Sequence, residues 1–138
     1  MEAEIVLTKL ESLNRCITRL EEKLPSEVDI LRENYDLQDI IILNLERSVQ
    51  LCVDLGLHVL SDSSIARPSS MAEVFHALSE NGILEKDVAE NLAKAVGFRN
   101  IAVHEYQELN WDIVWSILTN HISDFKGFGR QMYALLGK

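Results

Sequence analysis

The segment from residue 40 to residue 60 reads IIILNLERSVQLCVDLGLHVL, and its pattern decides the fold class. It lies in a stretch from about Ile30 to Leu60 that contains no proline. A helix of that length extends on the order of 40 Å at 1.5 Å per residue. Its apolar residues cover more than one face, which predicts a helix packed on several sides at the centre of a bundle. Because Glu46, Arg47 and Asp54 interrupt the apolar run, we expect a buried helix and no membrane span.

Two regular apolar stripes predict a helix at each end of the chain. Apolar residues recur at alternating steps of four and three from Val6 to Leu24, and Pro25 follows. The same steps recur from Val114 to Leu135, with His121 on the stripe and Asn110 as the expected N-cap. We expect one continuous helix in each stripe.

Capping signals delimit the remaining helices. Ser26 with Asp29 indicates a helix start. Ser70 with Glu73 indicates the start of a short third helix, and Asn81-Gly82 indicates its end. A fourth helix is expected from near Leu84 up to Gly97. Residues 61–70 form the one clear loop between apolar segments. Together these signals predict an all-α fold, a compact bundle of about four to five helices.

Length and composition describe one globular domain. The chain has 138 residues, of which 47% are hydrophobic and 25% are charged. Its six glycines and two prolines are too few for the turns of an all-β sandwich. The formal net charge of −9 opposes a protein that coats nucleic acid with a basic face, so any contact with RNA has to be local.

The cysteines and the first residues point to a cytoplasmic protein. Cys16 and Cys52 form no CxxC pair and are too few for a disulfide framework, so we expect two reduced core thiols. The opening MEAEIVLTKL has no basic region and no uninterrupted apolar stretch, so we expect no signal peptide and no association with a membrane.

The segment from Phe98 to Tyr106, FRNIAVHEY, carries the candidate chemistry. Helical spacing predicts that Arg99 points to the same face as Leu92. At about 100° per residue, Arg99 and His104 lie roughly 140° apart on a continuous helix. They can therefore serve one ligand only with a break in the helix or with a second subunit.

The surrounding residues mark where such a break is allowed. Gly97 precedes the motif and Asn110 follows it. If residues 103–107 are extended, the two-residue period of a strand puts His104 and Tyr106 on the same side.

This motif resembles the HEPN superfamily, and specifically the HepT-type toxins. The resemblance rests on Arg99, on His104 five positions later and on Tyr106 two further on, after Phe98 and before a tryptophan-bearing final helix. It extends from roughly residue 35 to the last helix, whereas the first helix is matched in kind more than in residues. It implies one HEPN-like domain over residues 1–138 that forms a homodimer.

The resemblance also implies an activity and its control. The chain would be a metal-independent endoribonuclease, the toxin of a type VII-like toxin–antitoxin pair, without a cofactor. Arg99 and His104 of both subunits would be catalytic in a cleft on the two-fold axis, with Asn100 as a supporting polar residue. A nucleotidyltransferase antitoxin of the MntA type would silence the nuclease by adding AMP to Tyr106.

The residue types fit that chemistry. RNA cleavage without a metal uses the ribose 2′-OH as nucleophile, so it needs a base, an acid and a cation beside the phosphate. Histidine, with an ordinary pKa near 6.5, serves as base or acid, and two copies of His104 can divide these roles. The Arg99 guanidinium matches phosphate oxygens in its donor geometry. DNA lacks the 2′-OH and should be left intact.

Each of these residues also has a purely structural interpretation. Arg99 can be a helix-end cation that faces the negative end of the helix dipole or pairs with an acid such as Glu105, and His104 a polar residue at a helix break. Tyr106 can be an ordinary half-buried aromatic residue. The alternative function is therefore a catalytically inert helical module that binds a nucleotidyltransferase or a nucleotide. Few basic residues flank the motif, so RNA affinity should be modest and salt-sensitive unless the cleft is locally positive.

The other candidate groups in the sequence give weaker indications of function. Glu73 and His76 form one Glu-x-x-His pair, but a di-iron site needs a second such pair and two more carboxylates, so we expect no metal. We expect four aromatic residues to pack in the core or at a dimer interface, and five acids to form a solvated face or a docking surface for a basic antitoxin. The aromatic residues are Trp111, Trp115, Phe125 and Phe128, and the acids are Glu27, Asp29, Glu33, Asp36 and Asp39.

Overall fold

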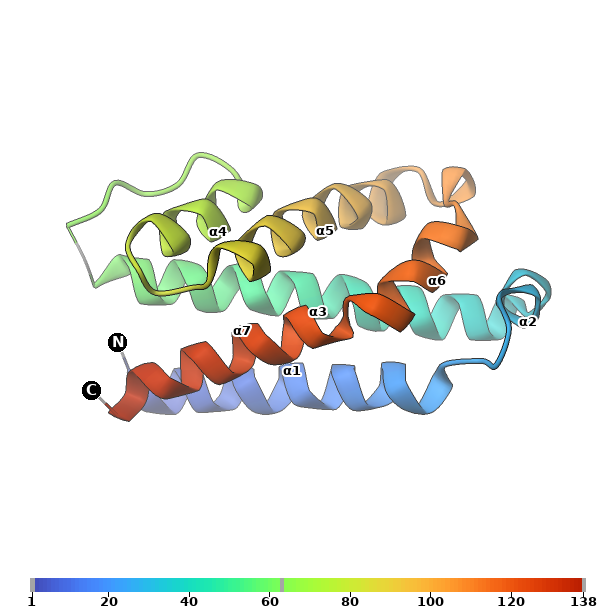
Figure 1. Ribbon diagram of the computed structural model, residues 1–138, viewed down its shortest axis with the longest axis horizontal. Helices are drawn as coiled ribbons and strands as arrows, with labels where there is room; N and C mark the ends of the chain where they lie inside the picture. The colour runs from blue at the N-terminus through green and yellow to red at the C-terminus, as the bar shows by residue number, and fades with distance from the viewer. Residues whose placement is uncertain (1, 63, 138) are drawn as a thin grey trace.

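The computed structural model describes residues 2–62 and 64–137, and all regular structure in these residues is helical. Seven α-helices and two short 3₁₀ turns follow one another along this part of the chain (Figure 1). They are α1 (Ala3–Lys23), α2 (Val28–Glu33), α3 (Tyr35–Ser61), α4 (Met71–Glu80), α5 (Lys86–His104), η1 (Tyr106–Glu108), α6 (Trp111–Asn120), α7 (Ile122–Ala134) and η2 (Leu135–Gly137). The predicted all-α bundle is confirmed.

Helix α3 is the central element of this bundle. It packs against α1 and α7 on one side and against α4 and α5 on the other (Figure 1). The helix that the apolar segment predicted is therefore confirmed, and it is buried along the side that faces these four helices. The buried apolar residues of α3 are Ile41, Ile42, Leu45, Val49, Cys52, Val53, Leu55, Val59 and Leu60.

The prediction of four to five helices is wrong because two predicted helices are each divided. Asn34 has an extended backbone and its side chain accepts a hydrogen bond from the Leu37 N–H, which ends α2 and begins α3. The C-terminal stripe is divided at His121, which ends α6. The His121 ring contacts Asp124 in the first turn of α7 at 2.9 Å. In both cases a polar side chain meets the first turn of the next helix, which favours a new start.

The predicted stop at Asn81-Gly82 is correct, since Asn81 caps the end of α4 and Gly82 has a φ of 72°. The predicted N-caps are correct at two sites and wrong at one. The Ser70 hydroxyl accepts from the Glu73 N–H and the Asn110 side chain from the Asp112 N–H, as expected. At Ser26 the prediction is wrong, because α2 begins at Val28 after Glu27 and has no side-chain cap.

Helix α5 does not end at Gly97, as the sequence predicted, but continues to His104. Glycine lowers helix stability by only about 1 kcal/mol relative to alanine. The residues on both sides of Gly97 are held by burial of Leu92, Val96 and Ala102, which outweighs that loss. Arg99 and His104 thus lie on one uninterrupted helix.

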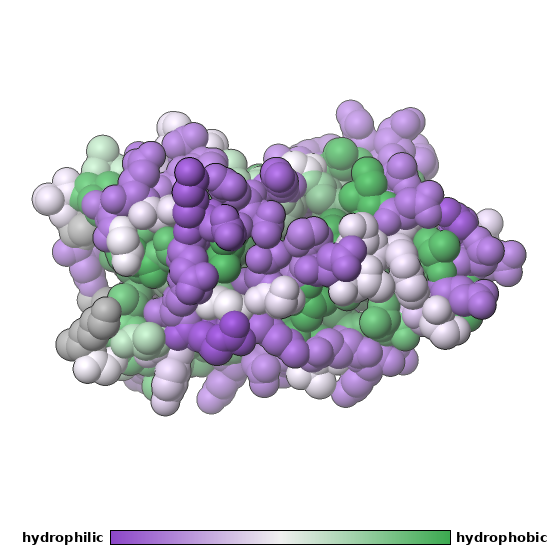
Figure 2. All heavy atoms as spheres, viewed as in Figure 1, coloured by the Kyte–Doolittle hydropathy of each residue, from purple (hydrophilic) through white to green (hydrophobic). Residues whose placement is uncertain are grey.

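The remaining expectations about the core are largely confirmed. Phe125 and Phe128 are fully buried, and the Phe128 ring meets that of Phe75 edge to face at 5.9 Å. Cys16 and Cys52 are buried free thiols, and burial raises the pKa of each. The face shown in Figure 2 is largely hydrophilic, with apolar patches between the polar side chains. Within the described chain, no helix has both the length and the apolarity needed to cross a membrane.

Candidate active site

Arg99 lies on the face of α5 that packs against α3. Its Nη2 donates a hydrogen bond to the Gln50 side chain of α3 at 3.3 Å, and its Nη1 donates to Asn100 at 3.3 Å. Its Nε is buried and has no hydrogen-bond partner among the residues described. The predicted orientation of Arg99 toward the bundle is confirmed.

The charge of Arg99 is not neutralised within this chain. Both partners of its guanidinium are neutral amides, and no carboxylate of residues 2–62 or 64–137 forms an ion pair with it. The ion pair with Glu105, one of the structural roles considered for Arg99, is not formed among the described residues. A half-buried, unpaired guanidinium with an unsatisfied N–H has the donor geometry and the charge that suit an anion.

Tyr106 occupies the first position of η1, directly after the end of α5. Its hydroxyl donates a hydrogen bond to the Asp39 carboxylate of α3 at 2.8 Å, and its ring meets Trp111 edge to face at 6.3 Å. The side chain is 37% exposed. Desolvation raises the pKa of the Tyr106 phenol, and the hydrogen bond to Asp39 and the negative charges of Asp39 and Glu46 raise it further.

His104 is the last residue of α5 and is exposed to solvent. Because α5 is uninterrupted from Arg99 to His104, the two side chains stay on faces roughly 140° apart. Residues 103–107 are not extended, since this segment contains the last turn of α5 and the start of η1, so the two-residue period of a strand does not apply to His104 and Tyr106. One chain alone does not bring Arg99 and His104 together.

Residues along one stripe of α3 accept hydrogen bonds from both Arg99 and Tyr106. Gln50 and Asp39, their respective partners, are eleven residues apart, which is about three turns, about 16 Å of rise and about 20° of rotation. Leu43 and Glu46 lie between them on the same side of the helix. Sequence reasoning missed Asp39 and Gln50 as site residues, although their helical spacing was visible in the sequence.

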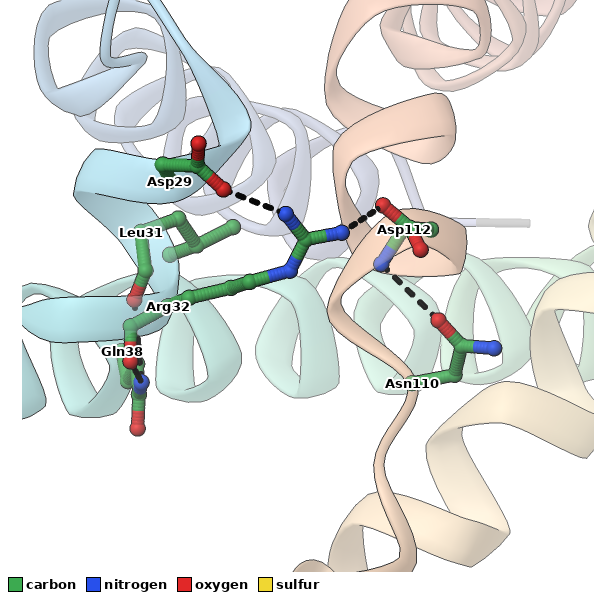
Figure 3. A network of polar contacts seen from close by, with 6 residues as sticks. All are labelled: Asp29, Leu31, Arg32, Gln38, Asn110 and Asp112. Atoms are coloured by element: carbon green, nitrogen blue, oxygen red, sulfur yellow. Dashed lines mark hydrogen bonds and ion pairs between the residues drawn. The ribbon is translucent and has the colours of Figure 1, made fainter.

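The loop that begins at Tyr106 is fixed at its C-terminal end by Arg32 of α2. Arg32 binds Asp29 one turn earlier and Asp112 in the first turn of α6, a set of contacts that we call the arginine clip, while Asn110 caps that turn of α6 (Figure 3). Gln38 of α3 donates to the carbonyl oxygens of Leu31 and Arg32 at 2.9 and 3.1 Å, which fixes α2 on α3. The clip therefore fixes the start of α6, and with it the end of the loop that begins at Tyr106.

Metal ligands do not gather in the described part of the chain. No three histidine, cysteine, aspartate or glutamate side chains there are placed to hold one ion. Glu73 and His76 accordingly have no further ligands beside them.

A family model described as ribonuclease HepT-like matches residues 13–132. The chain belongs to the ribonuclease HepT-like family. The predicted membership in the HepT-type family and the predicted class of enzyme, a ribonuclease, are therefore confirmed.

Named relatives agree with this membership. The chain is 36% identical to the mRNA nuclease HepT of Shewanella oneidensis over 91% of this chain and 93% of that protein. It is 25% identical to the tRNA nuclease HepT of Aphanizomenon flos-aquae over 99% of this chain and 92% of that protein. The two relatives are named for different RNAs, so the family does not fix the substrate.

A solved structure shows how a HepT-like protein is modified and bound. The tri-AMPylated Shewanella oneidensis HEPN toxin, in complex with an MNT antitoxin, superposes with a TM-score of 0.88 at 35% identity. The match covers 97% of this chain and 99% of that chain. In that relative the toxin carries AMP groups and contacts an antitoxin.

We predict that Asp39→Asn lowers the pKa of the Tyr106 phenol, because it removes a negative charge at hydrogen-bond distance. Desolvation remains, so the pKa should stay above its ordinary value. The measurement is a spectrophotometric phenolate titration of a Tyr35→Phe/Tyr133→Phe chain, in which Tyr106 is the sole tyrosine, over the alkaline range where circular dichroism shows a folded protein.

The matched control is Asp36→Asn, which removes the same charge one turn earlier on α3. It should leave the Tyr106 titration almost unchanged. Equal shifts in both variants would contradict a specific contact between Asp39 and Tyr106.

Proposed function

We propose that this HepT-like chain is a metal-independent endoribonuclease and the toxin of a type VII-like toxin–antitoxin pair, acting in the cytoplasm as a single domain over residues 1–138. The observation that carries the proposal is the unpaired guanidinium of Arg99, held by Gln50 and Asn100 and free to bind a phosphate. Asn100 thereby acts as a supporting polar residue. The relatives named as RNA nucleases support RNA as the substrate.

In the proposed reaction the ribose 2′-oxygen attacks the adjacent phosphorus, and the bond from phosphorus to the 5′-oxygen breaks. One His104 accepts the 2′-OH proton, and a second His104 donates a proton to the departing 5′-oxygen. Arg99 binds the phosphate oxygens on which charge accumulates in the transition state. The nucleophile belongs to the substrate, so DNA is not cleaved.

The geometry of α5 supports a homodimer as the active form. Because the helix is continuous, an Arg99 and a His104 that serve the same phosphate come from two subunits. Apolar side chains beside the motif offer a surface for the second copy: Leu43 on α3 is 43% exposed, and Ile101 and Val103 on α5 are 42% and 44% exposed. A two-fold axis through this surface makes each cleft from both chains.

Tyr106 is the proposed site of control. An MNT-type nucleotidyltransferase would transfer AMP from ATP to the Tyr106 oxygen, with release of pyrophosphate. The added phosphodiester is negative and bulky, so it competes with the substrate phosphate for Arg99 and blocks the cleft. The tri-AMPylated relative supports this mode of silencing.

We predict that the purified, unmodified chain cleaves total RNA in excess EDTA. His104→Ala should lower the rate at least about 100-fold, because it removes the proton-transfer group. Gel analysis of the fragments provides the measurement. The control His76→Ala, half-buried on α4, should cleave as the parent does.

If neither the parent nor His104→Ala cleaves RNA, and mass spectrometry shows Tyr106 unmodified, the proposed nuclease activity is wrong. That result would favour the inert module that binds a nucleotidyltransferase or a nucleotide.

We predict that Val103→Glu yields a folded monomer that no longer cleaves RNA, because a charge on the exposed apolar surface of α5 opposes its burial in a dimer. Analytical ultracentrifugation and the cleavage assay measure the two effects together. Ile5→Glu places the same charge on an exposed apolar residue in the first turn of α1 and should leave both properties intact. A monomer that still cleaves RNA would contradict a cleft shared between subunits.

We predict that incubation with the partner nucleotidyltransferase and ATP adds AMP to Tyr106 and abolishes cleavage. Mass spectrometry locates the adduct, and cleavage is compared before and after incubation. Tyr106→Phe lacks the acceptor oxygen, so its own rate should not fall on incubation. Equal rates for modified and unmodified parent protein would rule out this mode of control.

A further inference from the structure

A groove between α1 and α3 concentrates positive charge in an otherwise acidic chain. It has a volume of about 580 Å³ and is lined by Arg15 and Arg19 of α1 and by Arg47 of α3. Asp54 is the only acidic residue in the described lining, so the groove carries a local charge of +2, against −9 for the whole chain.

The positive charge of this groove is not balanced by nearby carboxylates. Asp54 accepts a hydrogen bond from Gln50 at 3.0 Å and lies 3.9 Å from Lys9, so its charge is already engaged. Among the side chains that the structure places, Arg15 and Arg47 form no ion pair, and Arg19 forms one loose contact of 3.8 Å with Glu22.

Arg15 and Arg47 line the same groove as Cys16 from the two facing helices, α1 and α3. The positive charges of Arg47 and Arg15 oppose the rise in the pKa of the Cys16 thiol that burial causes. Arg15 and Arg19 are one turn apart on α1 and project from the same face of that helix. The guanidinium groups are therefore gathered over one stretch of the surface, as a multi-site phosphate contact requires.

The groove is continuous with the candidate active site. Gln50, which lines the groove, is the residue that holds the Arg99 guanidinium. The lining also contains Leu51, whose apolar surface suits contact with an unstacked base. Four of the seven arginines of the chain thus lie along one path that ends at Arg99.

We propose that this groove binds the sugar–phosphate backbone of single-stranded RNA and leads the strand to Arg99. The inference rests on the proposed function, since the groove serves substrate binding by the same nuclease. It assigns to Arg15, Arg19 and Arg47 a role in affinity through phosphate contacts that do not depend on base identity. It also explains how an acidic chain binds an anionic substrate.

The experiment measures RNA binding without cleavage. A fluorescently labelled single-stranded RNA is titrated with His104→Ala protein, and the dissociation constant is determined by anisotropy over a range of salt concentrations. In the same background, Arg15→Gln/Arg47→Gln should weaken binding about tenfold or more. Because single strands contribute a slope of about 0.7 per phosphate contact, the slope of log K against log salt should fall by about 1.4.

Two controls separate a specific groove from total charge. Arg67→Gln/Arg130→Gln removes the same charge from a loop and from α7, and should leave the salt slope unchanged. Arg15→Lys/Arg47→Lys retains the charge and should keep most of the slope. Thermal melting by circular dichroism verifies that each variant is folded.

Several outcomes would overturn the proposal. One is an unchanged salt slope in Arg15→Gln/Arg47→Gln, and another is an equal loss in the charge-matched control. Unchanged RNA binding with lost binding of the nucleotidyltransferase would show a protein-docking surface instead. RNA cleavage by the parent protein is measured in parallel. If the parent cleaves RNA but the salt slope of the double variant is unchanged, the proposed RNA-binding groove is wrong and the proposed nuclease activity stands. If the double variant loses RNA binding but the parent does not cleave, the groove stands and the proposed nuclease activity is wrong.

Discussion

The burial of α3 on several sides is the constraint on which the rest of the structure depends. A helix of 27 residues that packs against α1, α4, α5 and α7 leaves only one side of its surface for function. That part carries Asp39, Leu43, Glu46 and Gln50 in one stripe. The stripe holds the end of α5 in place, so the position of Arg99 and of Tyr106 follows from the packing of a helix that contains neither.

The apolar pattern predicted the bundle because burial follows local periodicity. It did not predict the divisions at Asn34 and His121, because each depends on a side chain that meets the first turn of the following helix, a contact that periodicity does not encode. Gly97 shows the opposite error. A residue of weak helix propensity suggested a break, and tertiary burial on both sides of it kept the helix continuous.

The candidate site was partly visible in the sequence. The spacing of Arg99, His104 and Tyr106 is sufficient to place the chain in its family. The helical angle between the first two indicates either a break in the helix or a second subunit, and the continuous α5 leaves the second subunit. Asp39 was grouped with the solvated acids, because nothing in its neighbourhood distinguishes it from Asp36. Its role becomes visible only when α3 and the end of α5 lie side by side, 67 residues apart in sequence.

The hydrogen bond from Tyr106 to Asp39 also bears on the reactivity of the tyrosine. A phenol with a raised pKa stays protonated at neutral pH and is a weak nucleophile. A catalyst that transfers a group to this oxygen, as proposed for the antitoxin, therefore has to displace Asp39 or use it as the base that takes the phenol proton. Under the proposed function, silencing of the nuclease would then depend on how well the partner engages Asp39, a residue of α3 that carries no modification itself.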